Sequence, residues 1–134
     1  MRRMLSRCNT AVKATPSGKY TYAPGIALEL ENQLEEWYSC LPVANRFDKG
    51  EASAPPYLDD VPSCPLSNFL RVQYYCCRLS IYWPAVYQVM QDGSATRLLL
   101  DHCRIFFDSY ILVTPSILAA FHNCRVNRWT LFIT

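Results

Sequence analysis

The chain has 134 residues, of which 51% are hydrophobic and 18% are charged. This composition excludes a disordered protein and is sufficient for one domain with a sizeable core. The net charge of +2 is too small to indicate nucleic-acid binding from charge alone. Residues 1–24 carry five basic and no acidic side chains, whereas residues 25–60 carry two basic and eight acidic ones. We expect residues 1–24 to be an irregular lead-in that serves as an arm, a targeting segment or a solvated tail.

The first expected element is an amphipathic helix that begins at Gly25. Apolar residues recur there at spacings of four, four, three and four, which is typical of one helix face: Ile26, Leu30, Leu34, Trp37 and Leu41. Pro42 ends this helix, because proline disfavours helical geometry in the residue before it. Residues 42–65 contain five prolines and indicate a loop or linker. It is longer than the connections of up to about 12–15 residues that are usual in compact domains.

The second expected helix begins at Pro65 or Leu66 and includes a stretch, residues 69–90, that is apolar on nearly every side. It runs to about Trp83, where Pro84 is expected to kink or restart it. A helix that is apolar all round is normally buried. We therefore interpret this one as an inner helix of a larger helical domain. We expect it to be more exposed in this chain than its composition suits.

Two further helices are expected after Asp92-Gly93. The third is capped by Ser94 or Thr96, and its apolar face consists of Leu99, Cys103, Phe106 and Tyr110. Residues 114–116, Thr-Pro-Ser, end that helix and open a fourth one that continues through Ile117, Phe121 and Cys124. The chain stops at Thr134, within what looks like a further element. The expected fold is all-α, an irregular bundle of about four helices that forms part of a larger helical domain, with no strand–loop–strand pattern.

The cysteines and histidines do not form a recognisable metal or catalytic site. Structural zinc ligands usually come in pairs spaced by two to four residues, and none of the seven cysteines forms a CxxC pair. Cys76-Cys77 and His102-Cys103 are adjacent pairs, so on a helix their side chains diverge by about 100°. We expect no metal, no cofactor and no enzymatic activity. No apolar run reaches the 18 or so residues of a membrane span, so no membrane association is expected either.

Aromatic residues of the second helix are interleaved with arginines. Such a cluster could stack on nucleic-acid bases, but on helices it more often forms core. A small-molecule pocket is the stronger functional rival, because pockets favour aromatic walls with a few polar groups. If a site exists, we expect it to be an effector pocket or interdomain surface walled by five residues: Trp37, Tyr74, Tyr75, Arg78 and Trp83.

Four segments in this order resemble a known family. They are LEEWYSCLP at 34–42, LRVQYYCCRLSIYWPAVY at 70–87, HCRIFFDSY at 102–110 and VNRWTLFI at 126–133. Together they look like the regulatory region of fungal binuclear zinc-cluster, six-cysteine transcription factors, called the fungal-specific transcription factor domain or middle homology region. The resemblance covers residues 26 to 134. It departs from the family pattern at Trp83, where an arginine is usual, and at the bulky pair Phe106-Phe107.

The resemblance implies a partial regulatory domain, residues 25–134, that modulates transcription in the nucleus through effector or protein contacts. The zinc-cluster pattern by which the family reads DNA is missing from this sequence, so we expect no sequence-specific DNA binding by the chain. Its expected partners are the remainder of a larger helical regulatory domain, a homologous protein, or a small-molecule effector. Two alternatives stay open: a small helical interaction module that acts as a partner or decoy, cytoplasmic if it exists alone, and a helical small-molecule-binding or enzyme fragment.

Overall fold

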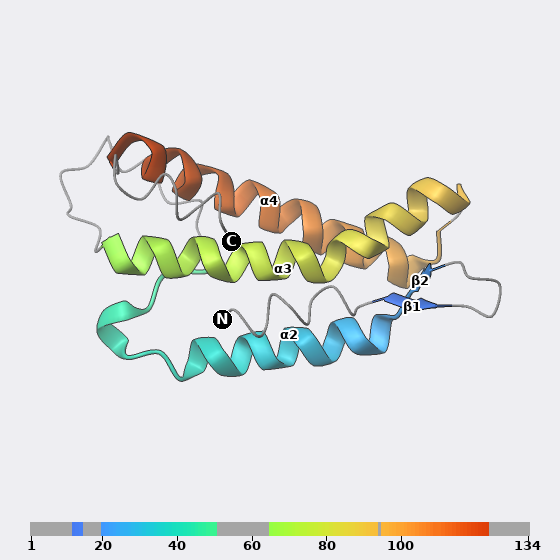
Figure 1. The fold of residues 1–134 in the computed structure, drawn as a ribbon, viewed down its shortest axis with the longest axis horizontal. Helices are drawn as coiled ribbons and strands as arrows, with labels where there is room; N and C mark the ends of the chain where they lie inside the picture. Colours follow the sequence, from blue (N-terminus) through green and yellow to red (C-terminus); the bar gives the residue numbers. More distant parts are fainter. Residues whose placement is uncertain (1–11, 15–19, 51–64, 94, 124–134) are drawn as a thin grey trace.

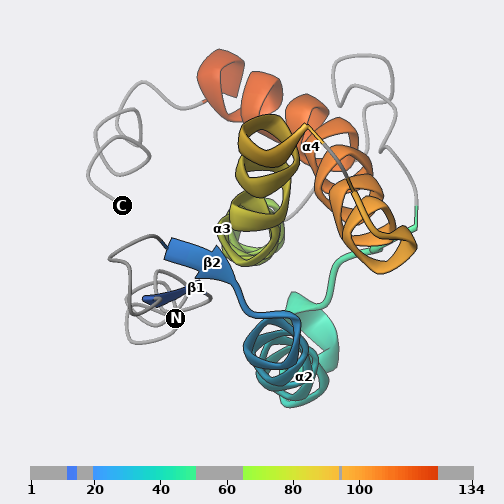
Figure 2. The same ribbon diagram turned by 90° about the vertical axis from the view of Figure 1, so that its right-hand side faces the viewer.

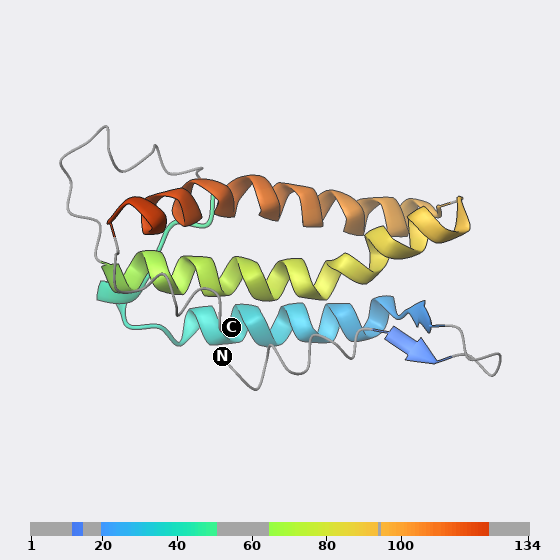
Figure 3. The ribbon, with the colours of Figure 1, turned by 45° about the horizontal axis from the view of Figure 1, so that its top comes forward.

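The computed structural model describes residues 12–14, 20–50, 65–93 and 95–123. In chain order the elements are β1 (Val12–Ala14), β2 (Tyr20–Tyr22), α2 (Pro24–Ser39), the 3-10 turn η1 (Val43–Asn45), α3 (Pro65–Asp92) and α4 (Arg97–Asn123) (Figure 1). The three α-helices run alternately up and down, with α3 in the middle (Figure 3). Seen end-on, α2 and α4 lie on different sides of α3 (Figure 2). The all-α expectation is confirmed in that the described chain is mostly helical. The expected count of about four helices is wrong, because the described residues contain three.

A short strand pair precedes α2. β1 and β2 pair antiparallel, with Val12 opposite Tyr22. The expectation of irregular backbone in residues 1–24 is therefore wrong for these two strands; residues 1–11 and 15–19 lie outside the described residues. The strand residues include valine, threonine and tyrosine, which favour extended backbone. Tyr22 is buried, and its backbone N–H donates to Oε1 of Gln88 in α3 at 2.8 Å, which fixes the pair against the helices.

Helix α2 lies close to where the apolar spacing predicted it. Pro24 occupies its first turn, where a missing N–H costs nothing, and Ala27, Leu30 and Leu34 are its buried residues. The last carbonyl groups of a helix have no partner within it. Here the guanidinium of Arg46 donates to the carbonyl oxygens of Ser39 at 2.9 Å and Leu41 at 3.1 Å. The chain is thereby turned back toward α3.

Residues 46–50, which we call the strap, cross from α2 to α3 and are held mainly by their backbone. The Tyr38 hydroxyl donates to the carbonyl oxygen of Phe47, and the Tyr75 hydroxyl donates to that of Lys49 at 2.7 Å. The guanidinium of Arg71 donates to the carbonyl oxygen of Asp48. The predicted loop thus begins with an ordered segment, while its residues 51–64 lie outside the described part of the chain.

Helix α3 is continuous through Pro84 and reaches Asp92. Figure 3 shows that α3 changes direction in its yellow part, which agrees with a kink, and the helix does not restart at Pro84. Ile81 and Ala85 are fully buried on either side of the proline, and their packing compensates for the missing backbone hydrogen bond. The helix ends at Gly93, whose φ of 60° is a left-handed conformation that glycine adopts without strain.

Helix α4 also contains a proline and is also continuous. Thr96 caps it, as expected, by accepting a hydrogen bond from the N–H of Leu99 at 3.3 Å. The predicted division at residues 114–116 is wrong, since α4 runs on to Asn123. Thr114 does not cap a new helix; its hydroxyl donates to the carbonyl oxygen of Tyr110 at 2.7 Å. Buried residues on both sides of Pro115, Val113 and Ser116, keep the two halves packed on α3.

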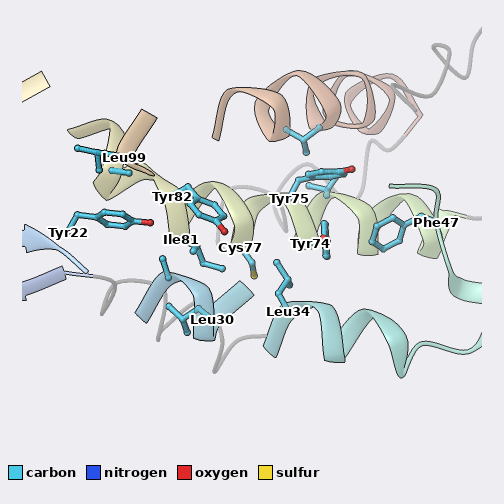
Figure 4. Packing of buried hydrophobic residues seen from close by; sticks show 14 residues of the cluster. Tyr22, Leu30, Leu34, Phe47, Tyr74, Tyr75, Cys77, Ile81, Tyr82 and Leu99 are labelled. Carbon is cyan, nitrogen blue, oxygen red and sulfur yellow. The ribbon is translucent and has the colours of Figure 1, made fainter. Parts of the chain in front are cut away.

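The core lies along both sides of α3 (Figure 4). Tyr74 faces α2 and Tyr75 faces α4, and both are almost fully buried. The most extensive helix contact is between α3 and α4. The residues that form the buried apolar cluster include Leu30, Leu34, Phe47, Val72, Cys77, Ile81, Tyr82, Leu99 and Val113.

Candidate functional site

The structure separates the five residues that the sequence suggested as a pocket. Trp37 is half-buried and packs on the core, and Tyr74 and Tyr75 are inside the core on different sides of α3. Arg78 is part of a polar contact with α2, whereas Trp83 is 49% exposed and packs against α4. These positions do not form one wall, and effector binding by the five residues stays a prediction.

Tyr74 and Arg78 instead belong to a polar network between α2, α3 and the strap, which we call the polar seam: Glu31, Glu35, Lys49, Tyr74 and Arg78. Nε of Arg78 donates to Oε1 of Glu31 at 2.8 Å. Glu35 accepts hydrogen bonds from Nζ of Lys49, at 2.5 Å, and from the Tyr74 hydroxyl. The ammonium group of Lys49 also lies over the Tyr38 ring, 4.2 Å from its centroid. Each charged group of the polar seam thus has an opposite charge beside it.

The two carboxyl groups of the polar seam have opposite pKa shifts. Burial raises the pKa of Glu31 above its ordinary value, and the nearby Arg78 only partly offsets this. Oε2 of Glu31 is buried without a hydrogen bond from the described residues, which is consistent with this strong desolvation. Burial also raises the pKa of Glu35, but hydrogen bonds from Lys49 and Tyr74 outweigh it, so its pKa is lowered. Such an arrangement links α2, α3 and the strap through paired charges.

A second polar contact joins β2, α3 and α4. The Tyr22 hydroxyl and Nδ1 of His102 are 2.7 Å apart, and the Tyr82 ring packs edge-on against the imidazole with centroids 5.2 Å apart. Burial lowers the pKa of His102, so its imidazole is neutral at physiological pH, and burial raises that of Tyr82 to about 12. A neutral histidine between two tyrosines resembles a general base, but it points into packed side chains. We interpret it as a structural contact.

A pocket lined by described residues lies at the end of the molecule where α3 turns into α4. Its volume is about 370 Å³, within the range of small-ligand sites. The lining is mixed: Tyr22, Pro24, Gln88, Asp92, Ala95, Thr96, Leu98 and Leu99. Sequence reasoning missed this pocket, because it depends on β2 reaching the α3–α4 turn, and three-residue strands leave no clear pattern.

The outer side of α3 and α4 carries an exposed apolar area, which we call the aromatic surface: Trp83, Phe106, Phe107, Tyr110 and Ile111. Phe107, Tyr110 and Ile111 are 54–62% exposed. On α3, Trp83, Tyr87 and Met90 are also exposed. Because α3 also lies at the centre of the core, the expectation that the helix as a whole is more exposed than its composition suits is not confirmed. Tyr110, which the sequence placed on the core face of its helix, faces outward.

Metal and membrane features are also informative within the described residues. Those residues contain no cluster of three or more histidine, cysteine or carboxylate side chains that could bind a metal ion. None of the described helices combines the length and apolarity that crossing a bilayer requires. Within the described part of the chain, the features that we consider for function are the pocket at the α3–α4 turn and the aromatic surface.

Sequence comparison shows that the chain is similar to a protein named as a transcription factor. The chain is 54% identical over all 134 residues to a curated protein of Aspergillus rugulosus named "Putative transcription factor ecdB". The match covers 25% of that protein, so the chain spans about a quarter of the length of the curated relative that it matches. It is therefore similar to one part of a transcription factor. No family model matches the chain, and no solved structure matches it.

Proposed function

We propose that this chain corresponds to part of the regulatory region of a fungal zinc-cluster transcription factor and modulates transcription through contacts with other protein segments. The observation that carries the proposal is the 54% identity, over the whole chain, to a transcription factor four times as long. The all-helical fold and the order of the four sequence segments support it. The aromatic surface gives such a chain an exposed apolar area for contacts with other protein segments.

The proposal assigns neither DNA binding nor catalysis to this chain. The sequence has no CxxC pair from which a zinc cluster could be built, and its net charge is only +2. The carboxyl groups with shifted pKa values, Glu31 and Glu35, contact other charged side chains between α2, α3 and the strap. We infer that the chain acts in the nucleus, where its longer relative would act, and that its effect on transcription is indirect.

A reporter assay tests this function. The Aspergillus rugulosus relative, fused at full length to a heterologous DNA-binding module, would drive a reporter gene with and without co-expression of this chain. We expect co-expression to change reporter output, because the chain competes for contacts that the relative makes within its own regulatory region. The Leu34→Ala variant, with a disrupted core, is expected to lose the effect. Unchanged output at equal protein levels would contradict the proposal, as would sequence-specific DNA binding by the purified chain.

The pocket at the α3–α4 turn supports a second candidate function, the binding of a small effector. Its lining combines leucine side chains with the Gln88 amide, the Asp92 carboxylate and the Thr96 hydroxyl, a combination that suits a small molecule with an apolar body and hydrogen-bond donors. A thermal-shift screen of such compounds would test this. Hits should raise Tm in the wild type and less so in Leu98→Trp, which is designed to fill the pocket; a screen without hits would rule this candidate out.

A further inference from the structure

The aromatic surface is a continuous set of rings shared by two helices. The ring of Trp83 on α3 lies 5.6 Å from that of Phe106 on α4, measured between centroids, with the planes inclined by 47°. Phe106 in turn contacts Phe107 edge-on, with centroids 5.3 Å apart. Tyr110 and Ile111 lie one helical turn further along α4, at the i+3 and i+4 positions from Phe107. The rings therefore bridge the α3–α4 junction on its outer side.

The same side of α4 carries further exposed apolar residues beyond the aromatic surface, with the exposed Arg104 between them. Leu100 and Leu118 are exposed and lie seven residues before Phe107 and seven residues after Ile111, on the same stripe of the helix. At 1.5 Å per residue this stripe is about 27 Å long. A typical surface helix is polar on its outer side. A contiguous exposed apolar area of this kind marks an interaction site.

The charges along the stripe do not call for a charged partner. Arg104 and Asp108 are one turn apart, and Nε of Arg104 lies 3.8 Å from Oδ2 of Asp108. Arg104 lies on the stripe between Leu100 and Phe107, and its charge is offset by Asp108; both side chains are highly exposed and long enough to stay solvated while the apolar residues are covered. The element that fits is therefore straight, apolar along one side and about as long as α4. An amphipathic α-helix with anchors spaced by three, four and seven residues has this form.

We propose that the aromatic surface docks an amphipathic helix from the part of a longer homologous transcription factor that this chain does not contain. The inference rests on the proposed function and gives it a specific surface and partner. The matched stretch of the Aspergillus rugulosus relative amounts to 25% of that protein, so three quarters of its length is available to supply the helix. A chain that presents the same surface in a separate molecule binds that helix in competition with the relative's own matched segment.

Synthetic peptides provide a direct test. Peptides of about 20 residues, long enough for a helix of about 30 Å, would tile the three quarters of the relative outside the matched stretch. We expect one or a few of them to bind the full chain and to gain helical circular dichroism on binding. Binding should shift the tryptophan emission to shorter wavelength, because Trp83 is 49% exposed in the free chain.

Two matched variants separate the aromatic surface from the rest of the molecule. Phe107→Gln removes a central ring and is expected to weaken peptide binding about tenfold or more, as for a hot-spot aromatic. Leu28→Gln changes a similarly exposed residue on α2, away from the α3–α4 junction, and should leave binding unchanged. Unfolding curves of both variants that match the wild type would confirm that folding is intact.

Several outcomes would overturn the proposal. They are the absence of any binding peptide, equal binding by Phe107→Gln, and self-association in sedimentation velocity that Phe107→Gln abolishes, which would make a second copy the occupant. The reporter assay is independent of these measurements. Peptide binding without a reporter effect would contradict the proposed function alone. A reporter effect that Phe107→Gln retains would contradict this docking site alone.

Discussion

The polar seam between α2 and α3 and the aromatic surface of α3 and α4 both include aromatic side chains of α3, yet these side chains are in opposite environments. In the polar seam, Arg78 donates to the Glu31 carboxylate, Tyr74 donates to the Glu35 carboxylate, and the Tyr74 ring is buried. On the aromatic surface, Trp83 and Phe107 touch other rings on one side and are open on the other. The difference teaches that α2 and α3 form a complete interface within this chain, whereas the outer side of α3 and α4 is half of an interface.

This contrast has an energetic basis. A buried pair of charges contributes little net stability, but removal of one partner is costly because the other is left unpaired. An exposed ring contributes little to folding until a partner covers it. Substitutions in the polar seam, or at buried apolar residues between α2 and α3, should therefore affect folding. Substitutions on the aromatic surface should affect binding.

The largest effect on folding is expected from Leu34→Ala. Leu34 is fully buried between α2 and α3, and removal of such a side chain typically lowers the free energy of unfolding by about 2–5 kcal/mol. Urea unfolding followed by circular dichroism measures this. The control is Leu28→Ala on the same helix, where the side chain is 60% exposed and the change should stay within about 0.5 kcal/mol. Similar effects of the two variants would mean that α2 does not pack as described.

An intermediate effect is expected from Arg78→Gln. The Glu31 side chain is only 13% exposed, so it loses its charged partner in a poorly solvated position. We expect a loss of about 2 kcal/mol, less than the 3–5 kcal/mol of fully buried pairs because Arg78 itself is partly solvated. The additional change Glu31→Gln should restore part of the stability in a double-mutant cycle. The matched control is Arg104→Gln at the exposed pair with Asp108, where the loss should be below about 1 kcal/mol.

The smallest effect concerns the pH dependence of stability. Burial raises the pKa of Glu31, so the folded protein holds this proton more tightly than the unfolded chain does. The contribution of Glu31 to stability is fully present below about pH 4.3, the pKa of this carboxyl group in the unfolded chain. It is lost as the pH rises through the higher folded pKa. Glu31→Gln should therefore gain stability relative to the wild type as the pH rises through this window, which Tm measurements between pH 4 and 7 would detect.

Glu35→Gln is the internal control, with the opposite sign. Because hydrogen bonds from Lys49 and Tyr74 lower the pKa of Glu35, its contribution is present above the unfolded pKa and is lost as the pH falls. This variant should lose stability relative to the wild type as the pH rises. The same slope for both variants would show that the two carboxyl groups do not differ as the structure indicates.

The sequence predicted elements well where local pattern and packing agree. The apolar spacing of α2, the cap at Thr96 and the stop at Gly93 are all local signals. Pro115 was misjudged as a helix boundary, because a proline costs one backbone hydrogen bond and buried neighbours such as Val113 offset that cost through packing. Which neighbours are buried is decided by the tertiary structure, so no local rule could have shown it.

The candidate site was predicted less well, for a related reason. Tyr74 and Arg78 were selected for their chemistry, but the groups that satisfy them, Glu35 and Glu31, come from another helix. A helix that is apolar all round carries no signal about which side faces the core. Trp83 and Tyr87 of α3 thus could not be assigned to the outside until α3 and α4 were placed side by side.

The strap after α2 limits which amino-acid substitutions this protein can accept during evolution. Tyr38, Arg71 and Tyr75 all bond to main-chain carbonyl oxygens of the strap, and every residue type supplies the same carbonyl group. Replacement of any of these three donors would therefore release a whole segment of backbone, whichever residue types the segment carries. The side chains of the strap are constrained by separate contacts: Oδ1 of Asp48 accepts a hydrogen bond from the N–H of Gly50 at 2.7 Å, and Phe47 is buried. In an alignment of homologues, we expect the three helix positions that hold the strap to be restricted as well.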